Sequence, residues 1–520
     1  MSGFLGKSIQ VVRDLSVDEQ VYLYEKSRLL KQQLQSRGNV ESFRINDPEV
    51  AVYLLFLEDS TRTKESFRNA AKFHAVRVND FSAQGSSLKK KESITDTVRM
   101  LVGYSSRSVF VVRSSLEGVC RWLERVIGEY TDKLGLPRAV FINAGDGRHE
   151  HPTQEFLDEF SFLEQRNWDR SYLHIALVGD LFHGRTVHSK VDGMRVFREV
   201  RVDLIAPPEL AMPVHYVDQM RENGYEVRLF PSIRAYVDAG DIASTWYFTR
   251  LQLERMGDQL LEKADSLRDA VTFRPEYVSR MSSECRFFHP LPRHSVTPTI
   301  PAFLDRTFLN GWDEQSMNGY FTRIVQIGML GGSIGDDFEG QSAVPQEYPD
   351  DFVEEAPIRT GPKPDYKIGI KPVDSGMVID HIGTGKSVEQ IWDHIFKIRR
   401  ILGLHVVGSQ GVFVSEQSGE HKGLISLPSV PEFDERMVKM LGAIAPGCTL
   451  NIIDDAKVVR KYRLHMPRRV YDFEEISCKN EACVSHPTHY EHVIPEFLRS
   501  GATTFVCKYC EKPHDFQEIW

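Results

Sequence analysis

Residues 60–63, S-T-R-T, bring hydroxyl groups, a guanidinium and backbone N–H groups together over four positions. The apolar run at residues 52–57 predicts a buried strand before them, and apolar residues at helical spacing from Phe67 onward predict a helix after them. The segment is therefore expected on the first turn of that helix, where unpaired N–H groups and the helix dipole favour an anion. Taken alone, such a segment is more often explained by Ser60 as an N-cap residue and Arg62 as a solvated charge.

Cationic and hydrogen-bonding side chains also follow the other strand candidates. They are Arg113, His151, Gln154, Arg185, Arg250, Gln252 and the H-P-L-P-R segment at 289–293. Arginine binds phosphate and carboxylate alike through its planar fork of donors. Few acids accompany these residues, and none has the spacing of a metal site or an acid–base dyad. The sequence thus predicts a site for a substrate with a phosphate and one or more carboxylates, acting by orientation and by stabilising developing negative charge.

Short apolar runs alternate with amphipathic helical stretches from about residue 40 to 332. Strand candidates lie at 109–113, 139–147, 175–180 and 202–207. This alternation predicts an open α/β architecture with mostly parallel sheets, in which ligands collect at the carboxyl ends of the strands.

The second half of the chain has a different pattern. Residues 333–365 are rich in glycine, proline and acids and are interpreted as a linker, either within one protomer or reaching to a neighbour. One helical stretch, 387–400, then lies among strand-like runs at 366–370, 376–382, 402–407, 411–415 and 449–453. This pattern predicts a small α+β domain with a largely antiparallel sheet. The segment G-T-G-K-S at 383–387 is interpreted as a turn before an N-capped helix, because Asp380 stands where a P-loop needs its first glycine.

Four cysteines have metal-ligand spacing, C-x4-C-x23-C-x2-C. They are Cys478, Cys483, Cys507 and Cys510. Four thiolates suit a tetrahedral zinc ion and leave no position for water, so the zinc would be structural. The alternatives are a nucleic-acid-binding zinc ribbon and a pair of disulfides. The acids of the segment argue against the first, and the expected reducing compartment argues against the second.

Composition sets broad limits. The chain has 520 residues, 41% hydrophobic and 26% charged, with a net charge of −9. Its length predicts about three or four domains. The acidic balance argues against a broad nucleic-acid-binding surface, and no segment is apolar enough for a membrane helix. Without a secretory pattern at the N-terminus, a cytoplasmic location is expected.

Residues 40–332 resemble the aspartate carbamoyltransferase catalytic chain, because the motifs quoted above occur in the family's order. H-P-L-P-R at 289–293 is similar to the aspartate branch, whereas the ornithine branch is expected to carry H-C-L-P and an S-M-G motif. The resemblance implies transfer of the carbamoyl group of carbamoyl phosphate to L-aspartate, in pyrimidine biosynthesis and without a catalytic cofactor. The alternatives are a transcarbamylase with another amine acceptor, or a nucleotide-sensing protein with a degenerate catalytic half.

The resemblance also implies residue roles. The phosphate would be held by Ser60, Thr61, Arg62, Thr63 and Arg113. The carbamoyl group would be held by Thr63, Arg113, His151 and Gln154. Aspartate would be held by Arg185, Arg250 and Gln252, in a pocket shaped by the backbone at Leu291 and Pro292. Glu58 would pair with Arg185 and Arg255 when the two halves close.

In the family a mobile loop supplies a serine and a lysine to the adjacent subunit, and here that region is 82–93. Ser86 and Lys90 are assigned, with Lys90 counted as catalytic. Counting from the other end of the loop selects Ser87 and Lys91, and a solvated lysine run is the alternative without function. A shared site implies catalytic trimers, and pairing of regulatory domains would join two trimers into six chains.

Residues 364–520 resemble the regulatory chain of the same enzyme, through G-M-V-I-D-H-I at 376–382 and C-K-Y-C-E-K at 507–512. The chain therefore resembles a natural fusion of both chains. A CTP or ATP effector site is implied at Asp380, His381 and Lys461, while a further expected lysine corresponds to Ser426.

The expected domains follow from these resemblances. They are a carbamoyl-phosphate-binding subdomain at 1–152 completed by a helix at about 316–332, an aspartate-binding subdomain at 153–315, the linker at 333–365, a regulatory domain at 366–466 and a zinc domain at 467–520.

Overall fold

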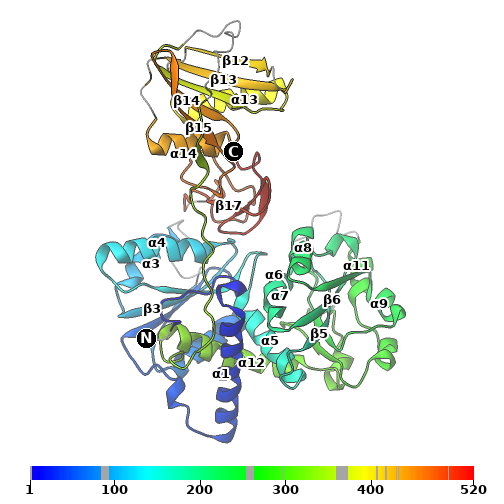
Figure 1. Cartoon of the computed structure of the whole chain (residues 1–520). Helices are drawn as coiled ribbons and strands as arrows, with labels where there is room; N and C mark the ends of the chain where they lie inside the picture. The colour runs from blue at the N-terminus through cyan, green and yellow to red at the C-terminus, as the bar shows by residue number, and fades with distance from the viewer. Residues whose placement is uncertain are drawn as a thin grey trace. The chain divides into compact units, whose positions relative to one another are not determined.

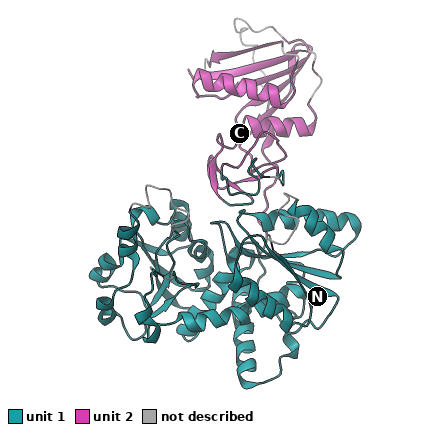
Figure 2. Cartoon of the chain, turned by 180° about the vertical axis from the view of Figure 1, so that it is seen from behind, with its two compact units in different colours: residues 1–344, 480–493, 509–511 teal, residues 345–479, 494–508, 512–520 magenta. Residues whose placement is uncertain are grey.

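The computed structural model describes residues 3–82, 93–252, 263–294, 296, 298–358, 373–405, 408–415, 418–428, 430, 433–489 and 491–520. The chain forms two compact units (Figure 2). The first comprises residues 1–344, 480–493 and 509–511, and the second comprises residues 345–479, 494–508 and 512–520.

The first unit contains a four-stranded parallel sheet in the order β2-β1-β3-β4. Its strands are β1 (Val50–Phe56), β2 (Arg77–Ser82), β3 (Arg107–Ser114) and β4 (Val140–Asp146). The helices of this part are α1 (Val17–Ser36), α2 (Thr61–Phe73), α3 (Ile94–Val102) and α4 (Val119–Leu134) (Figure 1). All residues of β1 and β4 are buried, as expected for a parallel sheet covered on both faces.

A second parallel sheet of the same unit has the order β7-β6-β5-β8-β9. Its strands are β5 (Tyr172–Val178), β6 (Glu199–Ile205), β7 (Glu226–Phe230), β8 (Thr245–Phe248) and β9 (Arg286–Phe288). Its helices are α6 (Arg185–His188), α7 (Lys190–Gly193), α8 (Val214–Glu222), α9 (Ile233–Ala239) and α11 (Ala264–Val271). The helix α5 (Pro152–Gln165) leads from the first sheet to the second, and α12 (Trp312–Gly331) packs against α1, α2 and α5.

The second unit contains a six-stranded sheet in the order β10-β15-β14-β11-β13-β12, whose strand pairs are antiparallel. The strands are β10 (Val353–Glu355), β11 (Gly376–Ile382), β12 (Ser409–Val414), β13 (His421–Pro428), β14 (Thr449–Asp454) and β15 (Lys457–Leu464). In the described residues of this unit the helices are α13 (Val388–Ile401) and α14 (Glu435–Ile444). A small antiparallel sheet follows, made of β16 (Arg469–Val470), β17 (Phe497–Arg499), β18 (Thr504–Cys507) and β19 (Pro513–Asp515).

These sheets confirm the predicted fold class, with parallel α/β sheets first and antiparallel sheets afterwards. Ser387 caps α13 in a capping box with Gln390, which confirms the interpretation of 383–387 as a turn before a helix. None of the helices in the described part of the chain combines the length and hydrophobicity that a membrane crossing requires.

Two sequence expectations for the second half were wrong. The strand at 402–407 is absent from its described residues, 402–405, because Leu402 caps α13 and Gly403 turns the chain with φ +61°. Helix α14 was not predicted. The linker at 333–365 stays a prediction, and within it β10 pairs with β15 in the second unit. At the other end of that segment, the backbone N–H of Gln341 donates to Asp18 in the first unit at 2.9 Å.

Candidate functional site

A cavity of about 1040 Å³ lies in the first unit, at the carboxyl ends of strands from both sheets. Every site residue that the sequence predicted for the catalytic half lines it, as far as the described ranges reach. These residues are Ser60, Thr61, Arg62, Thr63, Arg113, His151, Gln154, Arg185, Arg250, Gln252, Leu291 and Pro292. Ser86 and Lys90, their alternatives Ser87 and Lys91, and Arg255 lie outside the described residues. The structure thus brings together side chains from positions far apart in the sequence.

Ser60 occupies the N-cap position of α2, but its side chain makes no capping hydrogen bond. Arg62, two residues on, is exposed to the cavity, and an Nη1 hydrogen of Arg62 is donated to the carbonyl oxygen of Pro290. The surrounding protein limits its hydration, which lowers the pKa of Arg62 to about 10. Ser60 is therefore not a side-chain cap, and Arg62 is not a freely solvated charge. The explanation of this segment that requires no ligand does not apply.

Glu58 connects two arginines of the cavity. Its Oε2 accepts hydrogen bonds from Arg185 Nη1 at 3.3 Å and Nη2 at 3.2 Å, and it lies 3.2 Å from Arg113 Nε. Backbone carbonyls also hold these arginines, since Arg113 Nη1 donates to Ala144 O at 2.9 Å and Arg185 Nη1 to Gly147 O at 2.9 Å. The Glu58–Arg185 pair that the resemblance implied is present in this structure.

Gly145 allows these arginines to approach the backbone. Its φ is +109°, and a Cβ built there would lie 2.6 Å from Arg113 Nη1 and 3.2 Å from the His151 ring. Only glycine fits a site that combines this conformation with such close neighbours.

His151 stands at the N-terminus of α5, and its backbone N–H donates to Ser189 Oγ at 2.9 Å. Its Nδ1 lies 3.3 Å from Thr153 Oγ1. Burial, reinforced by the nearby positive charges of Arg113 and Arg185, holds the pKa of His151 well below its usual range. The imidazole is therefore neutral near pH 7 and is suited to donating a hydrogen bond rather than a proton.

Arg323, on α12, also lines the cavity but was missed in the sequence analysis. It is 5% exposed, its guanidinium lies 5.1 Å from the Phe67 ring centroid, and burial together with Arg62 lowers its pKa to about 9. The available signal was an arginine followed by the apolar stretch I-V-Q-I-G-M-L at 324–330.

The cavity has an excess of positive charge. Among the described residues, six arginines line it against two carboxylates, Glu58 and Asp59. One of the six, Arg293, is already paired with Asp305 at 2.5 Å. A cavity with this balance favours a ligand that carries several negative charges, such as phosphate and carboxylate groups.

The predicted effector residues lie on the six-stranded sheet of the second unit. Asp380 and His381 are at the end of β11, and Lys461 is on β15 opposite Asn451. A lysine that the sequence analysis did not select, Lys422 of β13, lies beside them, with its Nζ 3.0 Å from Asp380 Oδ2 and 3.4 Å from His381 Nε2. Ser426, the position where the family's lysine was expected, is on the same strand.

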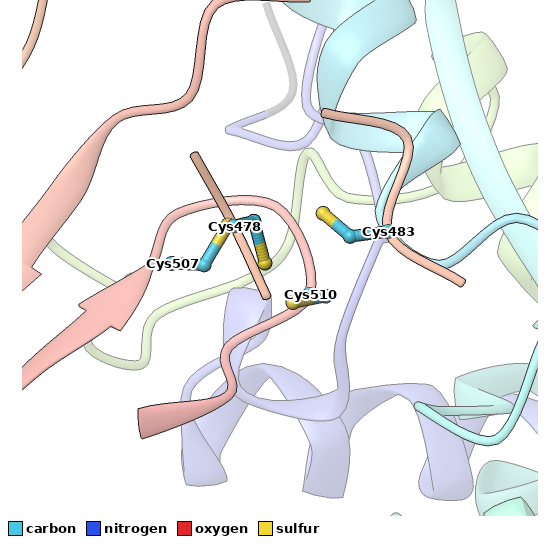
Figure 3. A group of neighbouring side chains, drawn as sticks. All are labelled: Cys478, Cys483, Cys507 and Cys510. Atoms are coloured by element: carbon cyan, nitrogen blue, oxygen red, sulfur yellow. The ribbon is translucent and has the colours of Figure 1, made fainter. Parts of the chain in front are cut away.

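The four predicted metal ligands form a compact cluster (Figure 3). Cys478, Cys483, Cys507 and Cys510 are buried, and their sulfur atoms lie within 4.8 Å of one another. They are thiols and not disulfides. Four thiolates so arranged fit a tetrahedral zinc ion with no open position, which is the donor set of a structural site.

Three family descriptions match parts of the chain. Residues 7–164 match the carbamoyl-P binding domain of aspartate/ornithine carbamoyltransferase. Residues 368–465 match the allosteric domain of the aspartate carbamoyltransferase regulatory chain, and residues 468–520 match the metal binding domain of that regulatory chain. The last match, with the buried cysteines, assigns this cluster as a structural zinc site.

Two curated relatives, both named Protein PyrBI, are similar over the whole chain. The one from Thermotoga maritima is 53% identical over 524 residues, covering 99% of each chain. The one from Treponema denticola is 49% identical over 528 residues, covering 99% of this chain and 98% of the relative. A solved structure of aspartate transcarbamoylase from Trypanosoma cruzi in complex with carbamoyl phosphate and aspartate has a TM-score of 0.54 at 25% identity, covering 63% of this chain and 98% of that chain.

Proposed function

Because the chain belongs to the family in which an aspartate carbamoyltransferase catalytic chain is fused to its regulatory chain, we propose that its cavity transfers the carbamoyl group of carbamoyl phosphate to L-aspartate. The products are N-carbamoyl-L-aspartate and phosphate, in pyrimidine (UMP) biosynthesis. The observation that carries this assignment is the convergence of six arginines on one cavity, which suits a phosphate beside a dicarboxylate.

In this proposal the phosphate binds the residues of the first turn of α2 and Arg113, and Arg185, Arg250 and Gln252 hold aspartate. The neutral amino group attacks the carbamoyl carbon, and the tetrahedral oxyanion that forms expels phosphate, which leaves with a proton. If the Thr153 hydroxyl donates to His151 Nδ1, the imidazole carries its proton on Nε2. That N–H can then donate to the carbamoyl oxygen as charge develops there.

The residues outside the described ranges complete the proposal. Ser86 and Lys90 of an adjacent subunit would contact the phosphate side of the site, so the smallest active assembly is a trimer, and paired regulatory domains would give six chains. Light scattering with activity measured on the same fractions tests this, and an active monomer would refute the shared site.

We assign residues 1–152, with the helix at about 316–332, to carbamoyl phosphate and residues 153–315 to aspartate. Residues 333–365 connect these to the regulatory domain at 366–466 and the zinc domain at 467–520. CTP and ATP are the proposed effectors at Asp380, His381 and Lys461, and the sheet adds Lys422 to that set. We place the enzyme in the cytoplasm, which its seven cysteine thiols favour.

The test is a steady-state assay with carbamoyl phosphate and either L-aspartate or L-ornithine as acceptor. Carbamoylation of aspartate is expected, with little or none of ornithine. Turnover with ornithine alone would overturn the assignment, and the absence of turnover with either would favour a nucleotide-binding protein with an inactive first unit.

A further inference from the structure

Behind the cavity, one buried carboxylate contacts two amide side chains that line it. Asp158 is on α5, one turn after Gln154, and is 0% exposed. Its Oδ1 accepts hydrogen bonds from Gln154 Nε2 at 2.8 Å and from Gln315 Nε2 at 2.6 Å. Its Oδ2 accepts from Lys190 Nζ at 3.0 Å.

This contact fixes which way each amide points. A carboxylate paired with an ammonium group can only accept hydrogen bonds, so each amide must turn its NH2 group toward Asp158. The oxygen of Gln315 then accepts the backbone N–H of His289 at 2.9 Å. Since Gln154 itself lines the cavity, its oxygen is the atom left to face a ligand.

Lys190 makes the arrangement hard to reverse. The ammonium group is 0% exposed and is held between Asp158 and Glu155, whose Oε2 lies 2.8 Å from Nζ. It also lies 4.0 Å from the Tyr247 ring centroid. Three donors thus converge on Asp158, and all of them require its oxygens as acceptors.

We propose that Asp158 is a positioning residue that holds the Gln154 carboxamide with its oxygen toward the ligand, so that the site selects an acyl phosphate bearing an NH2 group. This inference rests on the proposed function, and names the group by which the substrate is recognised. An acyl phosphate with a methyl group in that place would leave the Gln154 oxygen without a donor. Such a loss in a buried site weakens binding by about tenfold or more.

The first experiment uses the wild-type protein and acetyl phosphate, which differs from carbamoyl phosphate by methyl in place of NH2. Turnover with carbamoyl phosphate and aspartate is measured first, and its absence would refute the proposed function, not this inference. Calorimetry without aspartate then compares the two dissociation constants. Acetyl phosphate is expected to bind at least about tenfold more weakly, and equal binding would overturn the inference.

The second experiment compares Asp158→Asn with Glu155→Gln. Both residues are on α5, both are 0% exposed, and each variant exchanges one carboxylate partner of Lys190 for an amide. An asparagine at 158 turns its oxygen toward the ammonium and its NH2 group toward Gln154, which reverses the Gln154 amide.

Discrimination between the two acyl phosphates is therefore expected to fall to about threefold or less in Asp158→Asn and to stay at the wild-type ratio in Glu155→Gln. An unchanged ratio in the first variant, or an equal loss in both, would overturn the positioning role. If Asp158→Asn does not fold, Gln154→Met decides. It abolishes the discrimination if the proposal holds, and an unchanged ratio removes Gln154, and Asp158 with it, as the source of selectivity.

Discussion

The cavity of the first unit and the cysteine cluster both gather groups of one charge, but they differ in access. Six arginines face a cavity of about 1040 Å³, and Arg62 is exposed to it. The four cysteines are buried with their sulfurs within 4.8 Å of one another, so a zinc ion there has no position left for another ligand. The first site suits an anion that enters and leaves, and the second suits a cation that stays.

A third group of charges completes this comparison. Lys422 lies 3.0 Å from Asp380, so one of the two lysines of the predicted effector site is already balanced by a carboxylate. This site therefore has a smaller excess of positive charge than the cavity of the first unit.

The largest effect is expected from breaking the cysteine cluster. Cys483→Ser should lose the zinc, and because structural zinc contributes about 10 kcal/mol or more to folding, the segment 468–520 should unfold. Metal analysis and thermal unfolding measure both. Cys448→Ala is the matched control, since this buried thiol has its pKa raised to about 12 and lies outside the cluster. One zinc per chain in Cys483→Ser would contradict the assignment.

Arg62→Ala tests whether the arginines of the cavity bind the phosphate of the substrate. Removing a cation that stabilises the leaving phosphate should lower kcat/KM for carbamoyl phosphate by about 10²- to 10³-fold. Lys64→Met, on the same helix, is the control, because Lys64 pairs with Asp80 at 2.6 Å and does not line the cavity. A loss below about tenfold in Arg62→Ala, or a similar loss in the control, would remove Arg62 from the site.

A buried histidine in the core of the first unit should make the stability of the protein depend on pH. His74 Nε2 donates a hydrogen bond to Ile324 O at 2.8 Å, and burial lowers the pKa of His74 to about 4 from an ordinary value near 6.5. The unfolded chain therefore binds this proton more tightly, so the stability is complete above about pH 6.5 and is lost as the pH falls toward 4. Between pH 7 and 5 this residue should cost about 2 kcal/mol of unfolding free energy.

Denaturant unfolding at the two pH values measures this cost. His74→Gln should show a correspondingly smaller loss on acidification, because glutamine does not titrate. The same loss in both proteins would mean that His74 is not the group responsible.

The smallest effect is expected where charge is already balanced. Lys422→Ala should weaken CTP or ATP binding by about five- to tenfold, measured by calorimetry, because Asp380 already offsets the charge of this largely buried lysine. Lys457→Ala, an exposed lysine of β15, is the control. If the wild-type chain binds neither CTP nor ATP, the proposed effector site is refuted and the second unit has a structural role.

The contiguous motifs were predictable because local chemistry defines them. The residue types of the S-T-R-T segment are typical of a helix N-terminus. Arg113 lies near the end of the apolar strand β3, and His151 and Arg185 follow β4 and β5. Since parallel strands carry their ligand-binding residues at one edge, knowing the strands was sufficient to bring these side chains to one cavity.

The remaining features depend on packing between distant segments. Arg323 reaches the cavity because α12 returns to pack against α2 and α5, and Asp158 matters through two amides that meet only in the folded chain. Lys422 was missed because its relation to Asp380 depends on strand register, which the sequence alone did not provide. The roles of Ser86 and Lys90 stay predictions.

Gly145 has a consequence for how this enzyme can vary. Every other amino acid adds a carbon atom at the place where Arg113 Nη1 lies 2.6 Å away. A side chain at position 145 would displace both Arg113 and His151, although neither of these residues is itself changed. Natural selection at position 145 therefore acts against any side chain. A survey of substitutions should find Gly145 as intolerant of change as Arg113 and Arg185.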